Sequence, residues 1–136
     1  LGAHKWRDRR LVEALAATGT TPLLLDADGV VLEAAWGNVF ALEGALLVTP
    51  PTDGRLLPGV TRAALLDVAE EAGLAVTEAE LPLERLAAAD AIVVSSALAG
   101  ALPAQLEGRR GDELGAAALA RQLALAIGIA REPARA

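Results

Sequence analysis

The chain has 136 residues, of which 54% are hydrophobic and 22% charged, enough apolar residues for the core of one globular domain. Its 12 lysines and arginines and 18 acidic residues give a formal net charge of -6, which argues against nucleic acid or an anionic membrane surface as partner. The lack of cysteine and the single histidine exclude thiol catalysis, disulfides and the usual zinc sites, and no apolar run is long enough to span a membrane. We therefore expect a cytoplasmic protein without a metal site.

The N-terminal segment predicts a helix that continues to about Ala17, with an apolar stripe formed by Leu11, Ala14 and Leu15. Lys5 lies in the basic start of this helix. By its local pattern alone, Lys5 is one more solvated cation on a charged helix start.

Two β-hairpins are predicted next. Residues 22–26 and 30–33 are apolar runs that flank an Asp-Gly turn, and residues 38–42 and 45–49 flank a Glu-Gly pair. Together they predict a four-stranded meander of apolar strands that must be covered on at least one face. Asn38 is expected to have a structural role, in which its side-chain amide binds neighbouring backbone.

Glu33 stands out because it lies in the otherwise apolar run of residues 30–35. Burying an ionised carboxylate is costly unless it has a cationic or hydrogen-bonding partner. The first hairpin therefore presents a candidate functional carboxylate.

Residues 57–62, with the sequence Leu-Pro-Gly-Val-Thr-Arg, lead into an amphipathic helix predicted to end near Gly73. Its expected apolar face consists of Leu65, Val68, Ala69 and Ala72. The first turn contains Arg62 and no acid, so its backbone N–H groups and the positive end of the helix dipole can receive an anion. The alternative is an ordinary Pro-Gly turn with Thr61 as the N-cap.

The remaining elements alternate between strands and helices. Residues 74–81 predict a strand with one solvated face, residues 83–88 a short helix, and residues 91–96 a buried strand. Small residues at 97–103 follow and would let the backbone approach a ligand closely, although an ordinary strand end explains them equally well. An alanine-rich helix from about residue 113 to 127 closes the chain.

The order of four motifs resembles the signature of the class IV aminotransferases, the pyridoxal-phosphate (PLP) enzymes of fold type IV. These motifs are Glu33, the Asn-Val-Phe of residues 38–40, the Thr-Pro-Pro of residues 49–51 and the segment 57–62. The resemblance implies that Glu33 pairs with the pyridine nitrogen of PLP and that Leu57 packs on its ring. It also implies that the residues after the glycine hold the phosphate, which makes Gly59, Val60 and Thr61 cofactor-binding candidates.

Two further candidates come from the same resemblance. Lys5, within His4-Lys5-Trp6, matches the catalytic lysine that binds the cofactor covalently. Ser96 and Ala97 would form a second wall of the cofactor site, and Ala97 stands where aminotransferases carry a threonine.

The resemblance implies an α/β fold, a mixed-sheet pseudo-barrel with flanking helices like the C-terminal domain of D-amino-acid aminotransferase. Residues 1–136 would form this single PLP-binding domain. The N-terminal small domain, which supplies an arginine for the phosphate and much of the substrate pocket, would be absent, in keeping with a first residue other than Met. The full-length protein is expected to be a homodimer.

Within the family, the residues after Lys5 and the Ser96-Ala97-Leu98 triplet are similar to lyase members. The first function implied is 4-amino-4-deoxychorismate lyase, which gives 4-aminobenzoate and pyruvate for folate synthesis. The alternative is a branched-chain or D-amino-acid aminotransferase, which would meet its small-molecule amine substrate with the same residues. A hypothesis of another class is a catalytically inert scaffold or interaction domain. The isolated chain is expected to be inactive and to bind PLP, phosphate or sulfate loosely.

Overall fold

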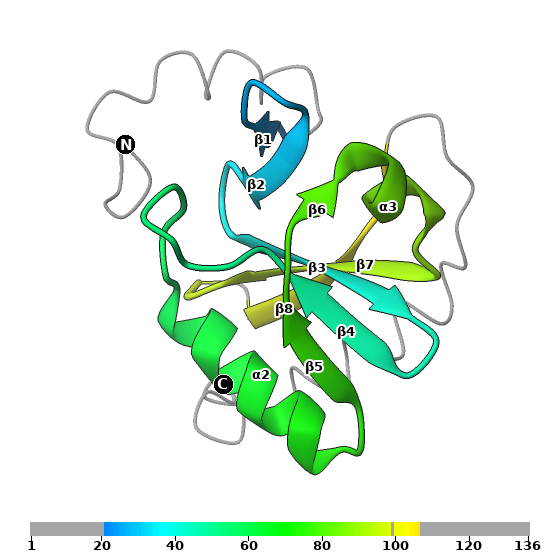
Figure 1. Ribbon diagram of the computed structural model, residues 1–136. Coiled ribbons are helices and arrows are strands. Elements are labelled where there is room, and N and C mark those ends of the chain that lie inside the picture. The colour runs from blue at the N-terminus through cyan, green and yellow to red at the C-terminus, as the bar shows by residue number, and fades with distance from the viewer. Residues whose placement is uncertain (1–20, 99, 107–136) are drawn as a thin grey trace.

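The computed structural model describes residues 21–98 and 100–106, and Figure 1 shows their arrangement. Both the predicted N-terminal helix with Lys5 and the predicted C-terminal helix over residues 113–127 lie outside the described residues. The described elements, in chain order, are β1 (Leu23–Leu25), β2 (Val30–Ala34), β3 (Asn38–Glu43), β4 (Leu46–Thr49), α2 (Val60–Glu71), β5 (Ala75–Glu78), β6 (Leu81–Pro82), α3 (Leu83–Ala88), β7 (Ala91–Ser96) and β8 (Gly100–Ala104).

Both predicted hairpins form, but they belong to different sheets. β1 pairs antiparallel with β2 in a sheet of order β1-β2-β6, and β3 pairs antiparallel with β4 in a sheet of order β5-β4-β3-β7-β8. The predicted four-stranded meander is therefore wrong. After β2 the chain turns through a single bridge between Ala34 and Gly37, and the free edge of β3 pairs with β7 instead.

Two later predictions also change. The predicted strand over residues 74–81 is split, because β5 pairs parallel with β4 in one sheet and β6 pairs with β2 in the other. Within the small residues of 97–103, those from Gly100 onward belong to β8, which pairs with β7 at the edge of the larger sheet. An edge strand tolerates Pro103, which cannot donate a ladder hydrogen bond. The prediction of α3 and β7 is confirmed at the same residues.

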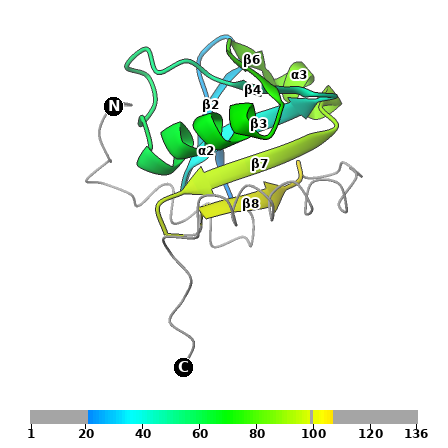
Figure 2. The same cartoon turned by 90° about the horizontal axis from the view of Figure 1, so that it is seen from below.

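α2 covers one face of the larger sheet, as Figure 2 shows. The apolar cluster beneath it consists of Phe40, Leu47, Leu65, Ala69, Val93 and Ala101. The helix begins two residues earlier than predicted, with Gly59 rather than Thr61 as N-cap and no side-chain cap. Thr61 is instead buried inside the first turn, and Ala72 is an exposed C-cap.

A second apolar cluster joins the two sheets and α3. Its buried members are Val31, Ala34, Val39, Ala41, Val48, Leu81, Leu86, Ala89 and Ile92. The described part is thus an α/β arrangement of mixed sheets with helices outside, which confirms the predicted class. Neither described helix is long and apolar enough to cross a membrane.

Candidate functional site

Glu33 lies in β2 and meets the segment that precedes α2. Its Oε2 atom accepts a hydrogen bond from the backbone N–H of Leu57 at 3.2 Å, and the side chain is half-buried. A partly desolvated carboxylate requires such polar partners, since burial without them is costly. The contact joins the predicted functional carboxylate directly to the predicted anion-binding segment.

Asn38 holds the same segment from the first residue of β3. Its Nδ2 donates to the carbonyl of Leu57 at 2.8 Å, and its Oδ1 accepts from the N–H of Gly59 at 3.3 Å. A Cβ atom on Gly59 would lie 2.4 Å from this Oδ1, which is too close without movement. The predicted structural role of Asn38 is therefore confirmed, and Gly59 is required by close approach rather than by its φ of -66°.

The start of α2 offers backbone donors. The first bond of the helical ladder joins the N–H of Ala63 to the carbonyl of Gly59, so the N–H groups of Val60, Thr61 and Arg62 have no place in that ladder. The first turn contains no acid. The Val60 side chain is 81% exposed, whereas that of Thr61 is buried. Three N–H groups at the positive end of a helix dipole are suited to receive an anion, as the sequence predicted.

The end of β7 lies beside this helix start. Ser95 pairs with Asn38 across the ladder, so Ser96 and Ala97 follow at the same edge of the sheet. In both views the end of β7 and the start of α2 lie on the same side of the molecule (Figures 1 and 2). The Ser95 hydroxyl is buried and has no hydrogen-bond partner among the described residues. Ser96 and Ala97, which were predicted to form a second wall, therefore lie on the same side of the molecule as the helix start.

The structure therefore gathers most of the predicted cofactor-binding residues. Direct hydrogen bonds link Glu33, Asn38, Leu57 and Gly59, and Val60 and Thr61 follow at once in α2. Lys5 lies outside the described residues. In the described ranges, no group of His, Asp and Glu side chains could hold a metal ion.

Arg62 is a residue whose role sequence reasoning missed. Its side chain is only 7% exposed, and Nη2 donates to the carbonyl of Pro50 at 3.0 Å and to the carboxylate of Glu78. Its Nε is buried and has no partner among the described residues. The side chain thus ties the first turn of α2 to the ends of β4 and β5. The Gly-Val-Thr-Arg motif gave the only signal for it.

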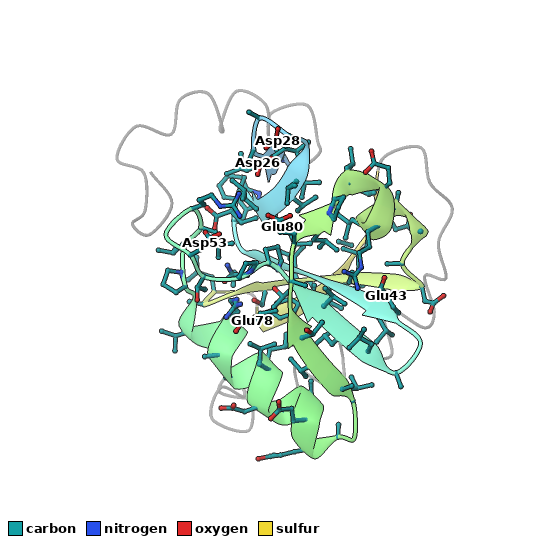
Figure 3. All side chains as sticks on the ribbon, viewed as in Figure 1. Asp26, Asp28, Glu43, Asp53, Glu78 and Glu80 are labelled. Carbon is teal, nitrogen blue, oxygen red and sulfur yellow. The ribbon has the colours of Figure 1, made fainter. Side chains whose placement is uncertain are left out.

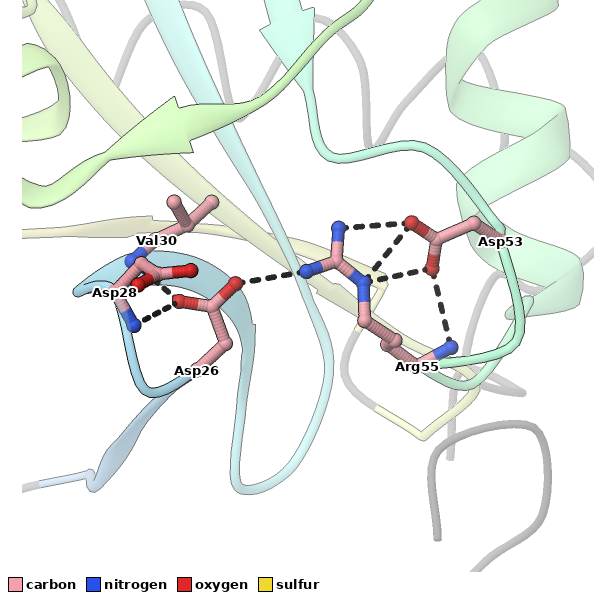
Figure 4. A network of polar contacts seen from close by, with 5 residues as sticks. All are labelled: Asp26, Asp28, Val30, Asp53 and Arg55. Atoms are coloured by element: carbon pink, nitrogen blue, oxygen red, sulfur yellow. Dashed lines mark hydrogen bonds and ion pairs between the residues drawn. The ribbon is translucent and has the colours of Figure 1, made fainter.

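Arg55 was missed as well, although it anchors the segment that carries Leu57. Its guanidinium binds Asp53 and Asp26, which lie on the same side of the molecule, as Figures 3 and 4 show. The backbone N–H of Val30 is the largest cause that lowers the pKa of Asp26. The backbone N–H of Asp28 and the guanidinium of Arg55 lower this pKa further. The hydrogen bond from Arg55 lowers the pKa of Asp53. These carboxylates are therefore ionised partners of Arg55 at neutral pH.

Comparison with known sequences identifies relatives of this arrangement. The family model described as amino-transferase class IV matches residues 7–106. A branched-chain-amino-acid aminotransferase of Escherichia coli strain K12 is 37% identical over 81 residues, which are 60% of this chain and 26% of that protein. A mitochondrial branched-chain-amino-acid aminotransferase of Arabidopsis thaliana is 35% identical over 80 residues, or 57% of this chain and 21% of that protein.

Solved structures agree with the sequence comparison. A hypothetical aminotransferase from Mycobacterium tuberculosis, bound to α-ketoglutarate and PMP, superposes with a TM-score of 0.80 at 25% identity, and the match covers 91% of this chain and 46% of that protein. An aminotransferase from Brucella abortus bound to PLP gives 0.71 at 30% identity, covering 85% and 44%. The chain spans less than half the length of each of these relatives. From the family match and these likenesses, the chain belongs to the class IV aminotransferase family.

Proposed function

We propose that this chain is the PLP-binding, C-terminal part of a branched-chain amino-acid aminotransferase. The sequence relatives with that name favour this alternative over the lyase, which the sequence pattern had put first. The observation that carries the proposal is the hydrogen bond between Glu33 and Leu57. It joins a carboxylate to the segment that leads into a helix whose first N–H groups make no bond in the helical ladder.

The residues of the site fit PLP in charge and in order. PLP has a basic pyridine nitrogen at one end and a phosphate at the other, and the site has a carboxylate on β2 and backbone donors at the start of α2. Leu57 lies between them along the chain and is half-buried, as a residue packed against the ring would be. When bound, the cofactor accepts electron density from the amine-bearing carbon of the substrate.

Each residue of the candidate site then has a defined role. Glu33 keeps the pyridine nitrogen protonated, and the N–H groups of Val60 and Thr61 hold the phosphate. Ser96 and Ala97 limit the site on the side of β7. Lys5 binds the cofactor and moves the proton at the amine-bearing carbon. An N-terminal small domain would complete the substrate pocket, and the full-length protein would be a homodimer acting on an amino acid and a 2-oxo acid.

One observation keeps the lyase as a second candidate. Ala97 occupies an exposed turn after β7, in a Ser96-Ala97-Leu98 triplet that is similar to lyase members rather than to the threonine of aminotransferases. Alanine at this position offers the phosphate a backbone N–H and no hydroxyl.

The full-length protein distinguishes these candidates when it is supplied with PLP. Leucine and 2-oxoglutarate should yield glutamate, whereas a lyase would release pyruvate from 4-amino-4-deoxychorismate. Borohydride reduction followed by peptide mapping should place the label on Lys5. Glu33→Gln should remove most turnover while the unfolding curve stays near wild type. A protein that shows no cofactor absorbance and neither activity would be the inert scaffold instead.

A further inference from the structure

We propose that Arg55 is a positioning residue for the site, which holds the segment before α2 against the β1–β2 hairpin and so keeps the Leu57 N–H on the Glu33 carboxylate. The effect on the cofactor rests on the proposed function. The contacts themselves involve only this chain.

The first part of this latch is local. Asp53 binds the Nε of Arg55 at 2.9 and 3.1 Å and its Nη2 at 2.8 Å, and also accepts the backbone N–H of Arg55 at 3.2 Å. Gly54, with a φ of +97°, makes the tight turn between the two residues. Asp53 therefore fixes the orientation of the guanidinium and leaves Nη1 pointing toward the hairpin, as Figure 4 shows.

The second part lies on the hairpin. Asp26 uses Oδ1 to accept the N–H groups of Asp28 at 2.9 Å and Val30 at 3.0 Å, and Oδ2 to accept Nη1 of Arg55 at 2.7 Å. One carboxylate thus shapes the turn that leads into β2 and receives the latch. Glu33 lies further along the same strand.

The same two segments are therefore joined twice, once by Arg55 and Asp26 and once by Leu57 and Glu33. Leu57 lies only two residues after Arg55. Between them, Leu56 is 2% exposed and keeps the segment in the core when the ion pair is lost. Loss of Arg55 should consequently loosen the Leu57 contact locally without unfolding the domain.

The chain offers a matched control. Arg85 binds the Glu43 carboxylate through Nε at 3.0 Å and Nη2 at 2.7 Å, and its side chain is 36% exposed, compared with 38% for Arg55. Figure 3 shows Glu43 on the side of the molecule opposite Asp53 and Asp26. Both arginines form partly exposed ion pairs with carboxylates, but Arg85 binds one carboxylate, far from the site, whereas Arg55 binds two.

Amide hydrogen exchange of Leu57, measured by NMR on the full-length protein without cofactor, tests the latch directly. Arg55→Ala and Asp26→Asn should exchange this amide about tenfold faster or more, whereas Arg85→Ala should leave it at the wild-type rate. Arg55→Lys should fall between, because an ammonium cannot bind both carboxylates as a planar fork does. Added salt should speed the exchange in wild type and not in Arg55→Ala. Equal protection of Leu57 in wild type and Arg55→Ala would overturn the proposal.

Measurements with PLP separate this inference from the proposed function. In an active protein, Arg55→Ala should raise the pH at which the cofactor absorbance changes. It should also lower kcat more than it raises KM. Arg85→Ala should change none of these quantities. If wild type binds no PLP but Leu57 exchange still depends on Arg55, the proposed function fails and the latch stands. If wild type is active and Leu57 exchange ignores Arg55, the latch fails and the function stands.

Discussion

The two ends of β3 are built in different ways. Gly37 and Asn38 at its start meet backbone and buried polar groups, whereas Glu43 and Gly44 at its end meet a surface arginine and the carboxylate of Asp90. At the first end, a Cβ on Gly37 would lie 1.9 Å from the carbonyl oxygen of Ser95. At the second end, a Cβ on Gly44 would meet nothing within 4 Å.

This difference separates contacts that serve a site from contacts that only close a turn. An exposed ion pair such as the one between Arg85 and Glu43 contributes about 0–1 kcal/mol. Buried amide contacts such as those of Asn38 cost about 1–3 kcal/mol when one partner is left unpaired. The contacts at the start of β3 are therefore the more costly ones to break. They bind the segment that leads into α2, whose first N–H groups lie outside the helical ladder.

The largest expected effect comes from placing alanine at Gly37, with Gly44 as the position for comparison. Gly37→Ala should lower the free energy of unfolding by about 3 kcal/mol or more, because the backbone carbonyl of Ser95 must move and the β3–β7 ladder with it. Gly44→Ala, at a φ of +59°, should cost only about 1 kcal/mol from backbone strain. Urea unfolding of both variants checks the difference, and equal losses would remove the contrast between the two ends.

Asn38→Ala should have the next largest effect. It leaves the carbonyl of Leu57 and the N–H of Gly59 without their partner, which should cost about 2 kcal/mol. Asn38→Asp keeps the acceptor for Gly59 and loses the donor to Leu57, so it tests the two bonds separately. Denaturation midpoints together with the cofactor affinity give the answer; an Asn38→Ala protein as stable as wild type would mean that these bonds contribute nothing.

Local patterns predicted much of the fold but not the way the hairpins combine. The sequence pattern predicted β7, as a buried apolar strand, and α3, as a short helix, at their observed bounds, since such patterns depend on neighbours in sequence. Whether β3 pairs with β2 or with β7 depends on long-range packing that no local pattern records. The Ala79–Glu80 crossing between sheets was missed for the same reason.

The candidate site shows the same limit. Glu33 and the segment from Leu57 to Thr61 could be predicted because a lone acid in an apolar run and a glycine before a helix are visible locally. Arg55 and Arg62 could not, because their acidic partners Asp26 and Glu78 lie 29 and 16 residues away. Only the folded chain brings these charges together.

Arg62→Leu should give a smaller loss than Asn38→Ala. It removes the bond to the carbonyl of Pro50 and the ion pair with Glu78, but Glu78 is 46% exposed and water can solvate its freed carboxylate. We expect a cost of about 1 kcal/mol, below the full range for bonds to charged groups. Phosphate binding, followed by chemical shifts of the Val60 and Thr61 amides, should weaken at the same time. Arg85→Leu is the control and should leave these shifts unchanged.

The smallest effect is a pH dependence that the carboxylates of Asp26 and Glu43 share and that only Asp26 transmits to the site. The pKa of Asp26 lies below its ordinary value of 3.8, mainly through the Val30 N–H with help from Arg55, and Arg85 holds the pKa of Glu43 below 4.5. Because both values are lowered by folding, both groups stabilise the protein above those ordinary values, and this contribution is lost as the pH falls through the folded pKa. Asp26→Asn and Glu43→Gln should therefore differ from wild type in stability at pH 7 and converge with it as the pH falls through the folded pKa of each carboxylate. The Leu57 amide exchange rate of each protein is divided by that of Arg55→Ala at the same pH. As the pH falls, this ratio should converge between wild type and Asp26→Asn, and not between wild type and Glu43→Gln. Convergence in Glu43→Gln as well would show that acid loosens the whole domain rather than the latch.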